Sequence, residues 1–396
     1  MFTRGSGRSH PGRVREQNED NHVVDDALGL YVVSDGMGGH AAGEVASQLT
    51  VDVVRQTIVA GQAIRTAVAN GERPLAELAA LAERAVLAAC AAVYERARED
   101  RRLAGMGCTV TMLLVAGARA VLAHVGDSRL YLLRDGVVYR LSSDHTLAAE
   151  MSRAGAFSEE HARTHHFAHT LTRSVGMQLA VAVDTLELAL APADRFVLCS
   201  DGLSNYLERD ELLATLTPAA LDAAPDGLIA HANASGGADN VTVIVVDVPP
   251  EAELTNRARR RQRALEAMSR SPLFEGYPLR SRARLLACGR LVSFKRDERL
   301  IARGQPLRSL FICLGGQLEV RASGDPPVTL NAGDAFGMAT LFHERAALAS
   351  VVGAAPGDVL ELERSKLMRL LRKRPRLGVG TLERLLALVS RNADLV

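Results

Sequence analysis

Four aspartates stand at the ends of predicted strands and could bind metal ions together. Asp35, Asp127 and Asp201 follow the apolar runs in LYVVSD, VLAHVGD and RFVLCSD, and Asp239 comes just before the run in DNVTVIVV. Because antiparallel neighbours place the end of one strand beside the start of the next, these side chains can gather on one rim. Clustered carboxylates repel one another unless cations lie between them, and all-oxygen ligands favour Mg²⁺ or Mn²⁺.

The glycines beside these aspartates bear on the same question. The segment DGMGG places three glycines within four positions of Asp35. A single Asp-Gly pair also forms an ordinary turn, and for any one of the aspartates that explanation suffices. Four such positions at buried strand ends favour a metal centre, in which the backbone carbonyl of Gly36 could approach an ion.

Five segments resemble, in order, the motifs of the metal-dependent protein Ser/Thr phosphatases of type 2C, the PPM family. They are VREQNED, SDGMGGHAAGE, HVGDSR, SDGLSN and GGADNVTVIVV, and the resemblance covers nearly all of residues 4–248. It implies an α+β fold, a four-layer α-β-β-α sandwich, with a dinuclear Mn²⁺ or Mg²⁺ centre. The implied activity is hydrolysis of phosphoserine and phosphothreonine on proteins through a metal-activated water.

The resemblance also implies roles for individual residues of the metal centre. Asp35 would bridge the two ions, and Asp201 and Asp239 would complete the first. The carbonyl of Gly36 would bind the second ion, which Asp20 would reach through water.

Further roles follow from the same resemblance. Asp127 would hold a third, more weakly bound ion, as in bacterial relatives. Arg15 matches the arginine that binds the substrate phosphate, and a guanidinium fork suits two phosphate oxygens. Arg173 is a second candidate for substrate binding. Animal members often carry a histidine general acid where this chain has Met37, so His40 or a metal-bound water remains open for that role.

Two other chemistries compete with this interpretation. Cys90 and Arg96 have the C-x5-R spacing of cysteine phosphatases, but CAAVYER lies in a predicted helix without a Gly-rich phosphate cradle. Five histidines between Asp144 and Val175 could hold zinc. The family resemblance instead places them in a mobile flap beside the active site.

The composition changes near Pro249-Pro250 and predicts two domains. A phosphatase domain over residues 1–248 precedes a charged linker helix over residues 249–270, and residues 271–396 form a second domain. Within the first domain, helical spacing predicts helices over residues 43–59 and 74–98. The Asp-Gly pair in RLYLLRDGVVYRLS predicts a β-hairpin.

The second domain is predicted to be a small β-barrel, a jelly roll, with flanking helices. Short apolar runs at residues 289–294, 309–314, 317–321 and 349–353 are separated by glycine- and proline-containing turns. Over about residues 270–395 the chain resembles the cyclic-nucleotide-binding fold of bacterial regulators, on the motif GDAFG and the spaced glycines Gly304, Gly315, Gly316 and Gly333.

The nucleotide site of that second domain is predicted to be degenerate. In nucleotide-binding members a glutamate follows the Phe-Gly pair that ends at Gly337, and an arginine nine residues later binds the cyclic phosphate. Here those positions are Met338 and Ala347, and Arg345 lies two residues early. A buried cyclic phosphate would therefore lack its counter-charge, and tight binding of cAMP or cGMP is not expected. The sequence does not identify another ligand or a protein partner for this domain.

Composition and charge limit the remaining possibilities. The 396 residues carry a formal net charge of +1, which argues against broad attraction to nucleic acid or membrane. Five cysteines without regular spacing suit a reducing cytosol, and no apolar leader or membrane-spanning run is found, so a cytoplasmic protein is expected. The expected partners are phosphorylated substrates of Ser/Thr kinases. A non-catalytic scaffold or cyclic-nucleotide sensor with a vestigial phosphatase domain is the alternative, and the intact ligand positions argue against it.

Overall fold

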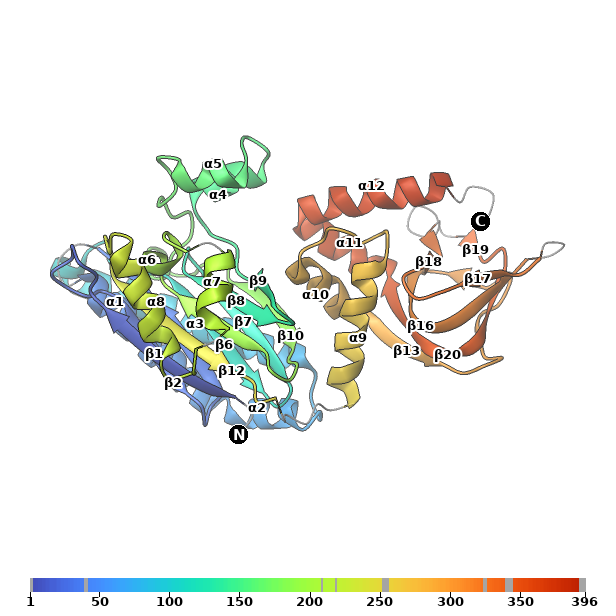
Figure 1. Cartoon of the computed structure of the whole chain (residues 1–396), viewed down its shortest axis with the longest axis horizontal. Coiled ribbons are helices and arrows are strands. Elements are labelled where there is room, and N and C mark those ends of the chain that lie inside the picture. Colours follow the sequence, from blue (N-terminus) through green and yellow to red (C-terminus); the bar gives the residue numbers. More distant parts are fainter. Residues whose placement is uncertain are drawn as a thin grey trace. The chain divides into compact units, whose positions relative to one another are not determined.

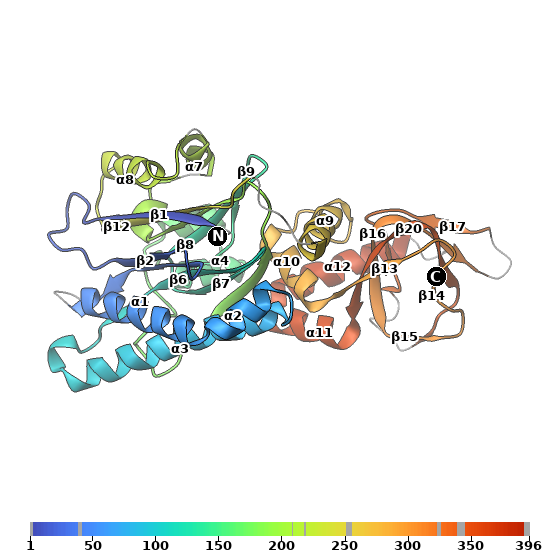
Figure 2. The same ribbon diagram turned by 90° about the horizontal axis from the view of Figure 1, so that it is seen from below.

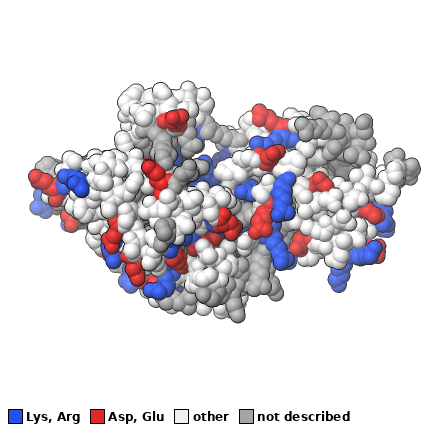
Figure 3. All heavy atoms as spheres, viewed as in Figure 1, with Lys and Arg blue, Asp and Glu red and all other residues white. Residues whose placement is uncertain are grey.

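The computed structural model divides into two compact units, Met1–Ala258 and Arg259–Val396 (Figure 1). It describes residues 3–38, 42–207, 209–217, 219–250, 256–322, 326–338 and 345–391. Acidic and basic side chains both occur on the face of the molecule drawn in Figure 3. No helix among the described residues is long and apolar enough to cross a membrane.

Two five-stranded antiparallel sheets form the middle of the first unit. One sheet has the order β1-β12-β11-β8-β9 and the other β10-β7-β6-β3-β2, and β4 and β5 form a separate pair. The strands of this unit are β1 (Arg4–His10), β2 (Asn21–Asp25), β3 (Leu30–Ser34), β4 (Gly36–Met37), β5 (Gly107–Cys108), β6 (Val110–Ala116), β7 (Arg119–Val125), β8 (Arg129–Arg134), β9 (Val137–Arg140), β10 (Asp184–Ala189), β11 (Arg195–Cys199) and β12 (Val241–Asp247).

Helices cover the outer face of each sheet, as Figures 1 and 2 show. The helices of the first unit are α1 (Ala42–Ala60), α2 (Gln62–Ala69), α3 (Leu75–Glu99), α4 (Leu147–Arg153), α5 (Glu159–Thr164), α6 (Asp201–Ser204), α7 (Arg209–Leu216) and α8 (Ala224–Ala234), with a 3-10 turn at Arg101–Leu103. α1 and α3 pack on one sheet, and α7 and α8 pack on the other. This gives the predicted four layers.

Side-chain alternation along the strands explains the layering. Leu30 and Val32 of β3 belong to the apolar cluster under α1 and α3. Tyr31 and Val33 are equally buried but point to the opposite face, where β3 contacts β11 and β12. Successive strand residues face opposite sides, so a strand buried on both faces is apolar throughout. Each such buried side chain contributes about 1.5–3 kcal/mol by leaving water.

Local sequence signals account for the element boundaries. The predicted hairpin is β8–β9, and its turn residues Asp135 and Gly136 have φ of 52° and 73°. Left-handed backbone at both turn positions matches the right-handed twist of the flanking strands. The second predicted helix is α3, with Pro74 in extended backbone at its N-cap.

The second unit is rich in β-structure. β13, β20, β16 and β17 form a sheet, in which β14 also pairs with β20 and β18 with β16, and β15 pairs with β19. Its elements are β13 (Arg290–Phe294), β14 (Arg299–Ile301), β15 (Pro306–Leu307), β16 (Ser309–Arg321), β17 (Val328–Leu330), β18 (Ala335–Phe336), β19 (Arg345–Ala346), β20 (Ser350–Glu363), α9 (Asn256–Arg270), α10 (Leu279–Cys288), α11 (Arg364–Lys373) and α12 (Pro375–Arg391). Closure of these strands into a barrel stays a prediction.

Two strands of this unit are longer than predicted. The runs at 309–314 and 317–321 are one strand, β16, with register shifts around Gly315 and Gln317. The intervening Gly316, at φ 77°, is therefore part of a bulge and not of a turn between two strands. The run at 349–353 continues to Glu363 as β20.

The predicted linker region contains α9. Its residues Ala264, Leu265 and Met268 are buried, and Arg260 makes an ion pair with Asp358 at 2.6 Å. From Arg259 onward the helix therefore packs as part of the second unit.

Candidate active site

The register of β2 and β3 brings two carboxylates together. Asn21 pairs with Ser34 at the end of this ladder. Asp20 directly precedes Asn21 and Asp35 directly follows Ser34, so both side chains lie at the same rim of the sheet. The Asp35 backbone is held by Thr109, whose N–H donates to the Asp35 carbonyl at 2.8 Å.

The second sheet brings its own carboxylates to its end in the same way. Cys199 of β11 pairs with Val243 of β12. Asp201 follows this pair as the first residue of α6, and Asp239 precedes β12. Hydrogen bonds join the two sheets at this rim: Ser200 Oγ donates to Asp20 Oδ2 at 2.8 Å, and the Glu19 N–H donates to Asn240 Oδ1 at 2.8 Å.

Arginine and backbone donors hold part of the cluster. Arg15 Nη2 donates to Asp239 Oδ2 at 2.8 Å, and the Asn240 N–H donates to Asp239 Oδ1 at the same distance. The Arg15 side chain is 54% exposed. Asp20 is 5% exposed, and its Oδ1 has no hydrogen-bond partner among the described residues.

The carboxylates raise one another's pKa. Burial, then the charges of Asp20 and Asp201, raises the pKa of Asp35 well above its usual value. Burial, outweighing hydrogen bonds from Ser200, raises the pKa of Asp20 to about 7. Burial and the charge of Asp201 raise the pKa of Asp127 to about 8. Concentrated negative charge of this kind is relieved by bound cations.

The chain leaves no room for a side chain at Gly36. A Cβ there would lie 2.2 Å from the Gly43 carbonyl oxygen and 2.5 Å from the Glu19 carbonyl oxygen. Gly36 pairs with Cys108 in the short β4–β5 ladder. The N-terminal turn of α1 and the segment before β2 can therefore approach this backbone only because residue 36 is glycine.

These observations fit hard divalent cations. The donors are carboxylate and carbonyl oxygens, one buried carboxylate oxygen lacks a partner, and three carboxylates have raised pKa values. Ligands of a two-ion centre span more space than those of a single ion, because the ions lie about 3.5–4 Å apart. The residues that would hold the ions are Asp20, Asp35, Gly36, Asp127, Asp201 and Asp239.

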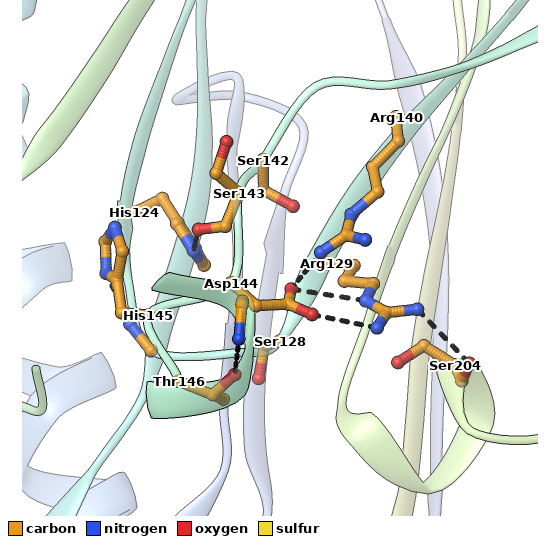
Figure 4. Close-up of polar contacts among 12 residues, drawn as sticks. His124, Ser128, Arg129, Arg140, Ser142, Ser143, Asp144, His145, Thr146 and Ser204 are labelled. Atoms are coloured by element: carbon orange, nitrogen blue, oxygen red, sulfur yellow. Dashed lines mark hydrogen bonds and ion pairs between the residues drawn. The ribbon is translucent and has the colours of Figure 1, made fainter. Parts of the chain in front are cut away.

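A buried ion-pair network, made by Arg129, Arg140 and Asp144, is shown in Figure 4. The Asp144 charge is close enough to Asp127 to contribute to the raised pKa of that carboxylate. Arg129 donates to both carboxylate oxygens of Asp144, at 2.8 and 3.2 Å, and Arg140 also pairs with this carboxylate. Arg129 further donates to the Ser204 carbonyl at the end of α6. Burial alone would raise the pKa of Asp144, but Arg140 and Arg129 outweigh it and hold that pKa below its usual range.

Hydrogen bonds of His145 hold both ends of the segment that carries α4 and α5 beside Gly126, the residue before Asp127. The Gly126 N–H donates to His145 Nδ1 at 3.1 Å, and the His145 N–H donates to the Gly126 carbonyl at 2.8 Å. The Thr172 N–H donates to the His145 carbonyl at 2.8 Å. Both ends of the projecting α4–α5 segment (Figure 1) are thus joined beside a predicted metal ligand.

Arg173, predicted to bind substrate, is engaged in the same network. Its Nη1 contacts Asp184 Oδ1 at 3.2 Å and His145 Nε2 at 3.3 Å. A phosphate-binding role would require this guanidinium to use donors beyond these contacts, so the role stays a prediction.

The sequence reasoning did not place Glu19 or His169 at the cluster, and it counted His169 only among the five histidines that could hold zinc. His169 Nδ1 lies 3.5 Å from Asp201 Oδ2, and this contact raises the pKa of His169. Within the described part of the chain, Asp127, His169 and Asp201 are the one group of three ligand-type residues whose ligand atoms all lie within 4.8 Å of one another. Glu19, inside the motif VREQNED, has a buried Oε1 without a hydrogen-bond partner among the described residues. The position of Glu19 within VREQNED was the sequence signal that could have identified this residue.

The other candidates fall outside this cluster. His40 lies outside the described residues. Cys90 is buried in α3, and its thiol donates to the Gln178 carbonyl at 3.1 Å. Burial raises the pKa of this thiol, which does not suit a nucleophile. Of the predicted zinc histidines, His165 stacks on Phe157 and His161 contacts the same ring in a tilted arrangement.

The nucleotide-site positions of the second unit are apolar and buried. Met338 is 4% exposed and Ala347 8% exposed. Gly337 adopts φ 76° just after β18. The Arg345 backbone pairs with Leu307 between β19 and β15, and its side chain lies outside the described part.

A cavity of about 630 Å³ lies at the opposite end of the sandwich, by the β8–β9 turn and the starts of β11 and the linker. Two ion pairs lie at its lining. Arg195 pairs with Asp247 at 2.7 Å, and Arg134 pairs with Asp194 at 2.6 Å. This cavity is unrelated to the carboxylate cluster.

Comparisons with known protein families match both parts of the chain. Residues 5–234 match the protein phosphatase 2C family and residues 291–374 match the cyclic nucleotide-binding domain. The chain belongs to the protein phosphatase 2C family.

Curated relatives and solved structures cover the first unit. A Listeria monocytogenes serine/threonine phosphatase, stp, is 35% identical over 256 residues, which are 64% of this chain and 97% of that protein. Mycobacterium tuberculosis PstP is 37% identical over 63% of this chain and 45% of its own length. Its crystal structure superposes with a TM-score of 0.56 at 34% identity, covering 63% of this chain and 100% of that one. A further PstP catalytic-domain structure, described as a complex with two manganese ions, has a TM-score of 0.53 at 34% identity and covers 63% of this chain and 99% of that one.

Proposed function

We propose that this protein is a Mn²⁺- or Mg²⁺-dependent phosphatase that hydrolyses phosphoserine and phosphothreonine on cytoplasmic proteins phosphorylated by Ser/Thr kinases. The observation that carries the proposal is the rim of mutually repelling carboxylates around Asp35 in a protein phosphatase 2C fold. Two divalent ions, with a third held more weakly by Asp127, would ionise the attacking water and neutralise the phosphate oxygens.

The chain's own residues would position the reaction. Arg15 already donates to Asp239 at 2.8 Å, so its remaining N–H groups can bind phosphate oxygens beside the ions. Asn240 and Ser200 orient Asp239 and Asp20, respectively, through hydrogen bonds of 2.8 Å. The general acid is His40 or a water, and the second unit acts as a regulatory or docking domain.

Metal-dependent turnover of a phosphothreonine peptide tests the proposal. EDTA should abolish release of phosphate and excess Mn²⁺ should restore it. Asp201→Asn removes a ligand charge and should lower kcat by about 10²-fold or more, because weaker metal binding leaves less ionised water. Asp222→Asn is the matched control, since this exposed carboxylate lies between α7 and α8.

Each outcome decides between the two functional classes. Full turnover in EDTA, or wild-type turnover by Asp201→Asn, would contradict the metal mechanism. Binding of the phosphopeptide without any release of phosphate in Mn²⁺ would favour the alternative of a non-catalytic scaffold.

A further inference from the structure

The two units carry opposite net charges. The first, residues 1–258, contains 22 Lys and Arg against 33 Asp and Glu, a net charge of −11. The second, residues 259–396, contains 25 against 13, a net charge of +12. The overall value of +1 therefore hides a strong asymmetry, which indicates an anionic partner for the basic unit.

This asymmetry creates a problem for the proposed substrates. A phosphorylated residue carries about −1.5 to −2 charges at neutral pH. Two divalent ions at the proposed centre would still leave the first unit at −7. Long-range repulsion would therefore slow the encounter of an acidic phosphoprotein with the catalytic unit, and a basic surface elsewhere in the chain can offset it.

Helix α11 presents the clearest basic face of the second unit. Leu367 and Leu371 are buried against the unit. Arg369, Arg372 and Lys373 are exposed and form no ion pair among the described residues. Lys366, one turn before Arg369, is also exposed, though it pairs with Glu363 at 3.2 Å. Figure 3 shows further basic side chains in the region where Figure 1 labels α9.

Helix stabilisation explains only part of this face. Arg372 and Lys373 stand in the last turn of α11, where cations interact favourably with the helix dipole. Arg369 lies in the middle of the helix, where that effect has faded. Four of the six basic residues of α11 and its C-cap are arginine, and the guanidinium group binds phosphate oxygens in pairs.

We propose that the exposed basic face of α11, made by Arg369, Arg372 and Lys373, docks acidic, multiply phosphorylated segments of substrate proteins. The proposal rests on the proposed phosphatase function and names its substrate class. Docking would raise the local concentration of phosphoresidues around a catalytic unit that otherwise repels them. It needs no cyclic nucleotide, which agrees with the buried Met338 and Ala347.

A binding experiment with the full-length protein in EDTA separates docking from turnover. The probe is fluorescein-labelled β-casein with its phosphoserine cluster, followed by anisotropy at low salt. The variant Arg369→Glu/Arg372→Glu/Lys373→Glu should weaken binding by about tenfold or more, because three exposed charges are reversed. Raising the salt concentration should weaken wild-type binding in the same direction.

The matched control is Arg296→Glu/Arg299→Glu/Arg303→Glu, which reverses three exposed charges around β14 in the same unit. This control should retain affinity within about threefold. Equal losses in both variants would overturn the assignment to α11. Tighter binding of oligothymidine or of phosphatidylglycerol vesicles than of phosphocasein would overturn the assignment to phosphoproteins.

A kinetic experiment completes the test. In Mn²⁺, the α11 variant should raise KM for phosphocasein and leave hydrolysis of p-nitrophenyl phosphate unchanged. A changed rate on this small substrate would show that α11 acts on the catalytic unit, which contradicts docking. Absence of turnover by the wild type would contradict the proposed function while leaving the binding result interpretable.

Discussion

Removal of the Asp144 carboxylate tests the buried ion-pair network that it forms with Arg129 and Arg140. The side chains of Arg129 and Asp144 are each 11% exposed and that of Arg140 is 15% exposed. Asp144→Ala would remove the carboxylate that pairs with two buried guanidinium groups. Breaking a buried pair by removing one partner costs about 3–5 kcal/mol in the free energy of unfolding. With two arginines affected, we expect a loss at the upper end of this range.

Tyrosine signals make the first unit observable within the full chain. The protein has no tryptophan, and five of its six tyrosines lie in residues 1–258. Near-ultraviolet circular dichroism in increasing urea therefore reports mainly on this unit. The surface pair of Arg73 with Glu77, at 52% and 41% side-chain exposure, provides the control, because Glu77→Ala should cost at most about 0.5 kcal/mol.

The pH dependence adds a second readout. Because its arginine partners hold the folded-state pKa of Asp144 below the unfolded value, this carboxylate stabilises the protein above its unfolded pKa. That contribution is lost as the pH falls toward the folded-state pKa. Asp144→Ala should therefore show a smaller stability loss on acidification than the wild type. A cost below about 1 kcal/mol, or an unchanged acid dependence, would refute the network's role.

Two further predictions concern the metal centre and the second unit. In EDTA the thermal midpoint should fall as the pH rises from about 5 to 8.5, because the raised folded-state pKa values of Asp20 and Asp127 make ionisation costly in the folded protein. Mn²⁺ should restore the midpoint most strongly at high pH, and a metal-free midpoint independent of pH would contradict the clustering. Isothermal titration of the full chain with cAMP should show no micromolar binding, because the side chains of Met338 and Ala347 can bind neither the ribose hydroxyl nor the cyclic phosphate of the nucleotide. A dissociation constant of about 1 µM, equivalent to about −8 kcal/mol, would refute this and direct attention to Arg345→Ala.

Sequence alone was sufficient where local signals and chemistry coincide. Continuous apolar runs predicted β3, β11 and β12, and the Asp-Gly pair predicted the β8–β9 turn. An aspartate at a buried strand end is a local feature, so Asp35 and Asp201 could be identified as candidates before their neighbours were known. The family motifs extended this to the order of the layers.

Tertiary structure decided how distant residues meet. The bond from Ser200 to Asp20 crosses between the two sheets, and no local pattern encodes it. His169 approaches Asp201 only because the α4–α5 segment folds back beside the rim. Arg173 was predicted from the family to face substrate, but its contacts with Asp184 and His145 depend on how that segment is fastened.

The same division holds in the second unit. The glycines at positions 315 and 316 predicted a turn between two strands. A bulge within β16 accommodates the positive φ of Gly316 as well as a turn does. Pairing with the long strand β20 along both halves of β16 selected the bulge. The charge of the second unit differs from its strand pattern in this respect, because the number of basic residues can be counted from the sequence alone. Only the division into two units, and the burial of Leu367 and Leu371 on the inner side of α11, turned that number into a basic face.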